Sequence, residues 1–241
     1  MTLMKPIAFL LLWLTLLDAS AQSLPDTQRL YCNLSFTYEV NPKFGRRYMK
    51  TVEGLVTGTC WAANINGQPV FFTAAHVLAR GPNFIQKSLE RAELRSLEIK
   101  PIIGLLGYEV QAVGFPKGNP DWVALRPKDA RVFKGSKIKE LAKSAPKVGD
   151  SLLVIGFPDT AHEQRTERTI TSISPNGEFI VFNQPLEPGY SGGVVLNGKN
   201  EAVGVVITSD AKQSIALILS PAMFSMLRWT PFKEVQTQNY C

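Results

Sequence analysis

A serine set between glycines, in the segment Gly189-Tyr190-Ser191-Gly192-Gly193, is the clearest candidate for a reactive group in the sequence. Glycines on both sides of a serine let the backbone turn sharply, expose the hydroxyl and bring N–H groups together where an oxyanion would form. A nucleophilic serine in acyl transfer needs this arrangement. Taken alone, the same glycines are also typical of a plain turn before a strand.

Two other segments hold side chains that could assist a nucleophilic serine. His76 follows the apolar stretch 71–75, which ends in small residues that let neighbouring loops close around an imidazole acting as a general base. Asp121 begins the apolar stretch 122–125, where a carboxylate is unfavourable unless it is paired. Singly, His76 also fits a hydrogen-bonded core histidine, and Asp121 also fits a turn or cap residue.

The order of these residues along the chain separates the classes of serine hydrolase. In α/β-hydrolases the histidine comes last, but the only histidines, His76 and His162, both precede Ser191. The subtilisin order needs an aspartate before the histidine, and the earlier aspartates, Asp18 and Asp26, lie close to the start of the chain. The order His, Asp, Ser of chymotrypsin-like enzymes remains, and His162 is interpreted as a surface loop residue.

Short apolar, β-branched segments alternate with turn residues along most of the chain, which predicts an all-β fold built as antiparallel barrels or sandwiches. The expected strands are residues 55–63, 68–73, 108–113, 122–125, 151–157, 178–182, 192–196, 202–208 and 214–219. Two helices are expected, over residues 85–92 and 221–229. The basic stretch 126–147 divides the strands into two groups and is interpreted as a solvated linker, with a site for an anionic partner as the alternative.

The composition excludes several classes of protein. With 45% apolar and 19% charged residues, the chain is globular rather than disordered, and a net charge of +6 does not indicate a nucleic-acid binder. Two histidines and three cysteines make a zinc site unlikely, so neither a metal nor an organic cofactor is expected. Any one pair of Cys32, Cys60 and Cys241 could form a disulfide, and Cys32 with Cys241 is preferred.

The first residues have the three-part form of a secretory signal. Lys5 precedes an apolar run from Pro6 to Leu17, and the small residues at 19–21 predict cleavage before Gln22. The apolar run is short for a bilayer span of roughly 30 Å. The sequence therefore predicts a secreted or periplasmic protein without a membrane anchor after cleavage, and an uncleaved anchor or a buried N-terminal helix is the alternative.

With these motifs in place, the chain resembles trypsin-like (chymotrypsin-fold) serine proteases, and in style the protease domain of the HtrA group, without a PDZ domain. The resemblance extends from about Gly54 to Leu227 and is carried by the segments 73–76, 121–125, 148–158, 189–193 and 203–207. It implies two antiparallel six-stranded-type β-barrels with a short C-terminal helix. The expected parts are a signal peptide (1–21), an N-terminal segment (22–53), a first barrel (54–130), a linker (131–147), a second barrel with the helix (148–230) and a tail (231–241).

The resemblance also assigns roles to the candidate residues. It implies that Ser191 is the nucleophile, that His76 acts first as general base and then as general acid, and that Asp121 orients the imidazole. The backbone N–H groups of Gly189 and Ser191 would form the oxyanion hole. Tyr190 stands where digestive proteases have an aspartate that binds a new N-terminus, so activation by that ion pair is not expected.

Substrate selection is inferred from two segments that flank the nucleophile. Pro185, six residues before Ser191, is not acidic, so cleavage after Arg or Lys is not expected. Residues Val205, Val206 and Ile207 resemble the strand that pairs with the substrate backbone, and Ile207 with Thr208 would wall a modest apolar pocket. The expected function is that of an exported serine endopeptidase acting on proteins or peptides, and the alternative is an inactive homologue that binds peptides.

Overall fold

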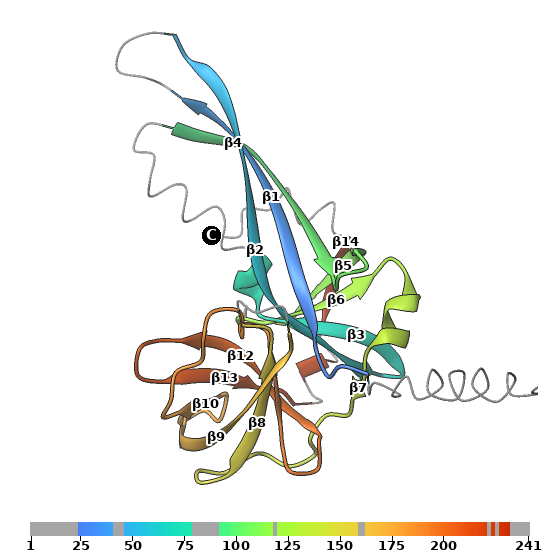
Figure 1. Ribbon diagram of the computed structural model, residues 1–241, viewed down its shortest axis with the longest axis vertical. Helices are drawn as coiled ribbons and strands as arrows, with labels where there is room; N and C mark the ends of the chain where they lie inside the picture. The colour runs from blue at the N-terminus through green and yellow to red at the C-terminus, as the bar shows by residue number, and fades with distance from the viewer. Residues whose placement is uncertain are drawn as a thin grey trace, which may run out of the picture.

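The computed structural model describes residues 24–40, 46–78, 92–117, 120–158, 162–220, 223–224 and 227–231. Two antiparallel β-barrels lie against one another, with a long arm of strands projecting from the first (Figure 1). The predicted signal peptide, the tail beyond residue 231, Cys241 and helix residues 85–91 lie outside the described residues. Within the described part, no helix is long and apolar enough to cross a membrane.

The N-terminal barrel consists of six strands in the order β1-β4-β5-β6-β3-β2, and pairing of β1 with β2 closes it. Its strands are β1 (Gln28–Val40), β2 (Tyr48–Ile65), β3 (Gln68–Thr73), β4 (Ala92–Ile103), β5 (Tyr108–Phe115) and β6 (Val123–Pro127). Two short strands extend the sheet: β7 (Ile138–Lys139) lies parallel to β2, and β14 (Arg228–Pro231) lies antiparallel to β5. A core that includes Leu30, Phe71 and Leu125 fills the barrel.

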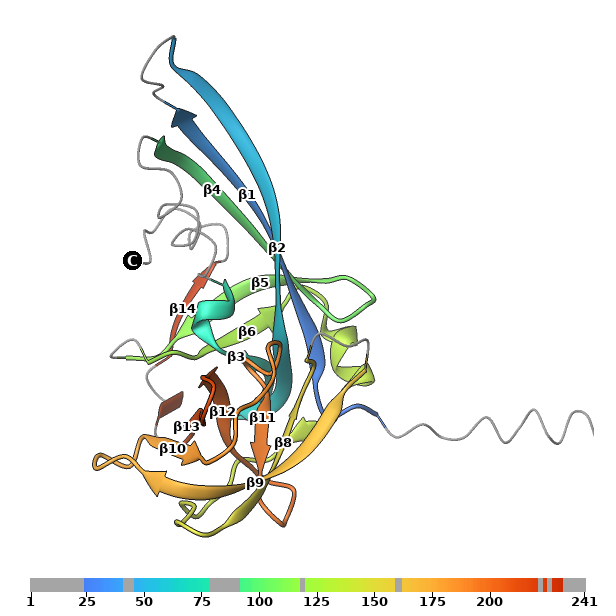
Figure 2. The same cartoon turned by 60° about the vertical axis from the view of Figure 1, so that its left-hand side comes forward.

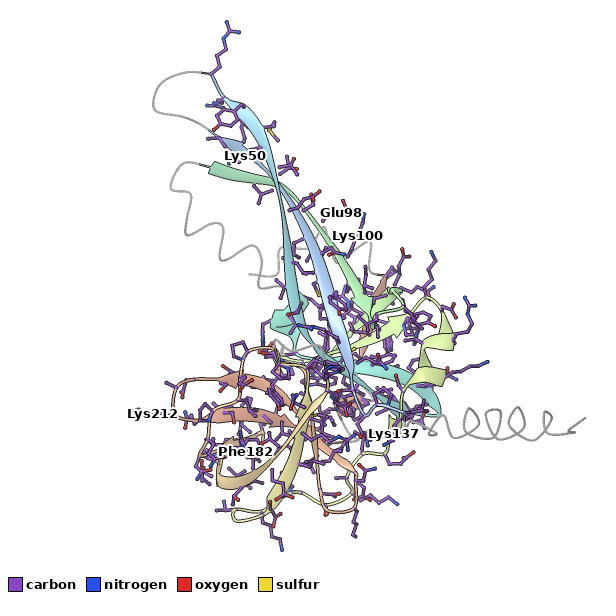
Figure 3. All side chains as sticks on the ribbon, viewed as in Figure 1. Lys50, Glu98, Lys100, Lys137, Phe182 and Lys212 are labelled. Atoms are coloured by element: carbon purple, nitrogen blue, oxygen red, sulfur yellow. The ribbon has the colours of Figure 1, made fainter. Side chains whose placement is uncertain are left out.

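The C-terminal barrel is closed in the strand order β10-β13-β12-β11-β8-β9. Its strands are β8 (Ser151–Gly156), β9 (Gln164–Ile173), β10 (Phe179–Phe182), β11 (Val194–Leu196), β12 (Ala202–Ser209) and β13 (Ser214–Ile218). Phe182, labelled in Figure 3, is fully buried in its core with Ile180. The predicted fold class of two six-stranded antiparallel barrels is confirmed.

A third apolar cluster joins the two barrels. Trp61, Phe72 and Trp122 come from the first barrel and pack with Ile155 and Val194 of the second. Phe72 stacks on Trp61 with ring centroids 4.9 Å apart and contacts Trp122 at 5.6 Å. These side chains are fully buried, so the hydrophobic effect holds the barrels together where β3 ends and β6 begins.

The arm is formed by β1, β2 and β4, which continue well past the barrel (Figures 1 and 2). At its far end Val40 of β1 lies between Tyr48 of β2 and Ala92 of β4. The outer part of β2 is exposed, and the side chains of Lys50, Glu98 and Lys100 project from the arm (Figure 3).

The arm corrects the expected division of the chain. Residues 22–53 were expected as a separate N-terminal segment, but 28–40 and 48–53 belong to β1 and β2 of the first barrel. The reason is that β1 alternates buried Leu30, Cys32 and Leu34 with more exposed residues, so one face of it completes the barrel wall.

Both predicted helices also need correction. Ala92 begins β4, and residues 228–229 of the expected C-terminal helix belong to β14. Of that helix, the described part retains only a short 3-10 turn at 223–224. The Trp229 ring packs over Gly114 of β5 and against the Arg126 guanidinium, 4.1 Å from its centroid, which favours the strand at this position.

The stretch expected as a solvated linker contains a 3-10 helix, η1 (Ala130–Gly135), and strand β7. Lys139 in β7 is only 2% exposed and forms an ion pair with Asp26, which is also 2% exposed. Arg165 contacts the same carboxylate, and Lys137 lies 3.5 Å from it. The N-terminal segment is therefore fixed to both barrels by a charge cluster centred on the buried Asp26–Lys139 pair, and the linker is solvated only in part.

Candidate active site

His76 and Asp121 are brought together because the strands that carry them are neighbours. His76 lies in the helical turn 75–78, just after β3, and Asp121 lies just before β6. Strands β3 and β6 are antiparallel, with Thr73 opposite Val123, so the end of one meets the beginning of the other. Spacing along the chain could not show this pairing, since 45 residues separate the two side chains.

The His76–Asp121 contact is made at two points. Asp121 Oδ2 lies 2.7 Å from His76 Nδ1, and Oδ1 accepts a 2.8 Å hydrogen bond from the His76 backbone N–H. A neutral imidazole that donates Nδ1–H to the carboxylate keeps its lone pair on Nε2. The side chains of His76 and Asp121 are 24% and 37% exposed, so the pair is reachable from solvent.

Ser191 lies in a tight turn that enters β11. Gly189 and Gly192 have φ of +99° and +85°, a region that glycine adopts without strain, and the Gly193 N–H donates a 2.7 Å hydrogen bond to the Tyr190 carbonyl. A Cβ on Gly192 would lie 2.1 Å from the Thr59 carbonyl oxygen. The glycines predicted from the sequence are therefore required both by backbone conformation and by close packing.

The turn around Ser191 packs against the strand that leads to His76. A Cβ on Gly192 would also lie 2.3 Å from Thr73 Oγ1 and 3.0 Å from the Ala74 backbone nitrogen. Gly58 of β2 lies between the side chain of Val77, which follows His76, and the Ser191 carbonyl. The structure thus gathers the three predicted segments at the junction of the barrels.

The two N–H groups predicted to form an oxyanion hole are not used elsewhere. Among the described residues, neither the Gly189 N–H nor the Ser191 N–H donates a hydrogen bond to a protein acceptor. By contrast, the Tyr190 N–H between them bonds to the Glu187 carbonyl at 3.4 Å. Two free donors beside a nucleophilic serine are what an oxyanion site requires.

Tyr190, which stands where digestive proteases have an aspartate, is buried in the C-terminal barrel. Its side chain is 6% exposed and packs into the core of the C-terminal barrel, with the ring directly against Gly156. Burial raises the pKa of the Tyr190 phenol, and the charge of Glu187 raises it further. The ring therefore acts as an apolar anchor for the turn that it begins.

Two of the residues predicted to pair with the substrate backbone already have partners within the protein. Val205 pairs with Val194 on one side and with Leu217 on the other, and both polar backbone groups of Val206 bond to the Gly192–Gly193 turn. Neither Val205 nor Val206 can therefore pair with a substrate, which corrects the prediction. From Ile207 onward, β12 is paired only with β13 among the described residues.

The other predicted substrate residues lie near this free edge. Thr208 is exposed, and Ser209 Oγ accepts a 2.8 Å hydrogen bond from the backbone N–H of Leu186, next to Pro185. The Pro185 carbonyl accepts a 3.3 Å hydrogen bond from Arg168. The sequence did not predict this Ser209 contact, because nothing in the local sequence distinguishes the residue.

No group of three or more potential metal-ligating side chains occurs in the described part of the chain.

Comparison with known proteins identifies the family of the chain. The sequence profile of the trypsin-like peptidase domain matches residues 56–205, which include all three predicted catalytic residues. The active form of the Rv3671c protease from M. tuberculosis is 15% identical and superposes with a TM-score of 0.54, covering 87% of this chain and 84% of that one.

A second solved structure is the serine endoprotease from Yersinia pestis, which is 17% identical with a TM-score of 0.49. The match covers 81% of this chain but only 59% of the Yersinia protein. At these identities the structural likeness concerns the fold, whereas the profile match covers well over half of the sequence. The chain therefore belongs to the trypsin-like peptidase family and has its serine protease fold of two β-barrels.

Proposed function

We propose that the chain is an exported serine endopeptidase that hydrolyses peptide bonds through a triad of His76, Asp121 and Ser191. The observation that carries the proposal is the double contact between Asp121 and His76 beside the turn that holds Ser191. It supports a general base with a fixed ring orientation, whose Nε2 makes no hydrogen bond to the described residues. The proposed chemistry uses only side chains and backbone groups of the chain.

In the first half of the reaction, Ser191 Oγ attacks the carbonyl carbon of the scissile peptide while His76 Nε2 takes the hydroxyl proton. The Asp121 carboxylate stabilises the resulting imidazolium. The attack places a negative charge on the substrate oxygen, which accepts hydrogen bonds from the backbone N–H groups of Gly189 and Ser191. The C–N bond then breaks, and His76 gives its proton to the departing amine.

In the second half, water replaces the amine. His76 Nε2 takes a proton from the water as its oxygen attacks the acyl carbon, and the same two N–H groups receive the charge. Collapse of this second intermediate releases the carboxylic acid and returns the proton to Ser191 Oγ. The enzyme ends in its starting protonation state.

The substrate backbone is proposed to pair as an added strand with residues 207–209 of β12, whose outer edge has no partner among the described residues. Ile207, at the start of this edge, is 8% exposed and belongs to the apolar cluster between the barrels. With Pro185 in place of an acidic residue, small or medium apolar side chains are the proposed preference before the cleaved bond. Profiling with a peptide library that gave a strong Arg or Lys preference would contradict this.

Export is proposed from residues 1–21, on the sequence pattern alone. We expect protein recovered from the medium or periplasm of a bacterial host to begin at Gln22, as determined by N-terminal sequencing. Recovery of the chain only in the cytoplasm, with Met1 intact or removed, would contradict export without touching the proposed chemistry.

The decisive experiment is labelling with a fluorophosphonate, which reacts covalently with an activated serine. The wild-type chain should label, whereas Ser191→Ala should not, and His76→Ala should label far more slowly. Circular dichroism of each variant shows whether it is folded. If the folded wild-type chain does not label, the proposed endopeptidase activity is wrong. The alternative, an inactive homologue that binds peptides, would then be the function.

A further inference from the structure

Thr59, on β2, connects the first barrel to the turn that carries the nucleophile. It is fully buried, and its backbone N–H donates a 2.8 Å hydrogen bond to the Ser191 carbonyl. Its hydroxyl donates to the Gly189 carbonyl at 2.8 Å and accepts from the Phe157 N–H at 2.8 Å. Three hydrogen bonds from one side chain and its backbone therefore reach the second barrel.

Thr59 is itself held in place by the strand that leads to His76. Its carbonyl accepts a 2.8 Å hydrogen bond from the hydroxyl of Thr73, the last residue of β3. Both threonines are fully buried, and so is the hydrogen bond between them, so water does not compete for it. The position of Thr59 is thus tied to the same element that positions the general base.

These bonds fix the direction of the peptide groups in the turn. The carbonyls of Gly189, Tyr190 and Ser191 accept from the Thr59 hydroxyl, the Gly193 N–H and the Thr59 N–H, respectively. Because each peptide group is planar, holding the carbonyls of Gly189 and Tyr190 also fixes the N–H groups of Tyr190 and Ser191, on the opposite side of the same peptides. The Gly189 N–H belongs to the preceding peptide, so its direction depends on rotation about the two backbone bonds at the Gly189 Cα.

Packing limits that rotation. The Cα of Gly189 lies so close to the end of β8 that a Cβ would be 2.3 Å from the Phe157 carbonyl oxygen and 2.8 Å from Pro158 Cα. The Thr59 hydroxyl bonds to Phe157 and Gly189 together, so it closes a link between the end of β8 and the turn. Loss of the hydroxyl would leave the half-buried Phe157 N–H and Gly189 carbonyl without this partner.

From this arrangement we infer that Thr59 is a positioning residue for the oxyanion hole, acting from the opposite barrel through Gly189. The inference rests on the proposed protease activity. The hydroxyl does not contact the substrate. By holding the Gly189 carbonyl beside the end of β8, it limits the rotation at the Gly189 Cα that would turn the Gly189 N–H away from the reacting carbonyl. Its contribution therefore falls on the transition state and not on substrate binding.

The test compares Thr59→Val, which keeps the shape and removes the hydroxyl, with Thr59→Ser, which keeps the hydroxyl. For Thr59→Val we expect kcat on a peptide substrate to fall by about tenfold to a hundredfold, less than the 10²–10³ typical of removing an oxyanion donor outright, with KM within twofold. Thr59→Ser should retain kcat within about threefold of the wild type, since its oxygen can make both bonds. Thr230→Val, a buried threonine on β14, is the matched control and should leave kcat unchanged.

A readout independent of activity is amide hydrogen exchange at Phe157. Its N–H should exchange faster in Thr59→Val than in the wild type or in Thr59→Ser, because its acceptor is gone. Wild-type kcat in Thr59→Val, or an equal loss of kcat in Thr59→Ser, would overturn the inference. A wild-type chain without fluorophosphonate labelling would overturn the proposed function instead, and unchanged exchange at Phe157 would still overturn the role of Thr59.

Discussion

The carboxylate of Asp121 contacts His76 twice, with Oδ2 2.7 Å from the ring Nδ1 and Oδ1 2.8 Å from the backbone nitrogen. The backbone contact sets where the carboxylate lies, and the ring contact sets which imidazole nitrogen carries the proton. One side chain thus fixes both the position and the tautomer of the proposed general base.

Replacing this carboxylate by an amide should separate geometry from chemistry. Asp121→Asn can keep the bond to the His76 N–H, but its NH2 group favours the tautomer with the proton on Nε2, which cannot accept one. We expect kcat to fall by about 10⁴-fold with the fold intact, measured by steady-state hydrolysis of a peptide. Asp129→Asn, at the cap of η1, is the control and should keep full activity. An Asp121→Asn variant with near wild-type kcat would rule out the triad.

The tight packing at Gly192 predicts a strong effect of a single methyl group. Gly192→Ala places a Cβ against the Thr59 carbonyl and forces a residue with a side chain into a φ of +85°. We expect the free energy of unfolding in urea to fall by roughly 2 kcal/mol or more, and fluorophosphonate labelling to be lost. At Gly198, where a Cβ would meet open space, the same substitution should change neither. Equal free energies of unfolding for Gly192→Ala and Gly198→Ala would contradict the close packing of Gly192 against Thr59.

The buried ion pair of Asp26 predicts how stability depends on pH. Burial raises the pKa of Asp26, but the hydrogen bond from Lys139 and the charges of Lys139, Arg165 and Lys137 outweigh it, so the pKa is lowered from its ordinary value of 3.8. A lowered pKa in the folded state means that the carboxylate stabilises the fold above the pKa of the unfolded chain, about 3.9. This stabilisation is lost as the pH falls through the folded-state value.

Removing the charge should reproduce that loss at neutral pH. Asp26→Asn leaves Lys139 buried without its counter-charge, and we expect a loss of about 3–5 kcal/mol in the free energy of unfolding at pH 7. Urea unfolding of both proteins at pH 7 and at pH 3 should show the gap narrowing in acid. A gap that stays constant over this range would mean that Asp26 does not titrate with folding.

The two described cysteines should be inert in the folded protein. Cys32 and Cys60 are both free thiols, and burial raises the pKa of Cys32 to about 12. Burial, with the charge of Cys32, also raises the pKa of Cys60 well above its ordinary value. We expect neither to react with iodoacetamide at pH 8 until urea is added, with peptide mass mapping to locate the label. Rapid labelling of Cys32 in the native protein would contradict its burial.

Chain order and glycine spacing were enough to predict which three segments of the sequence lie at the candidate site. The sequence also predicted the barrel strands around Thr73, Asp121 and Ser191 because each has a local apolar or turn pattern. It could not predict that Lys139 is buried, since the partner that makes this possible lies 113 residues away. The role of Thr59 is of the same kind, because hydrogen bonds across two barrels leave no local pattern.

Two other misses have different causes. Strand β1 does alternate apolar and polar residues, but the resemblance begins only at about Gly54, and the residues before it were assigned to a separate segment. The assignment of Val205 and Val206 to a substrate edge failed because edge and interior positions of one strand have the same composition. Only the pairing of neighbouring strands tells them apart.

Strand β14 has a consequence for the order of events during synthesis. It follows every strand of the C-terminal barrel in the chain, yet it pairs with residues 112–115 of β5 in the first barrel. A chain that leaves a ribosome or an export channel N-terminus first therefore presents an uncovered edge of β5 until the whole second barrel has emerged. Docking of β14 onto the first barrel is a late, long-range step, so newly made chains remain open to protease attack and to edge-to-edge association until it occurs.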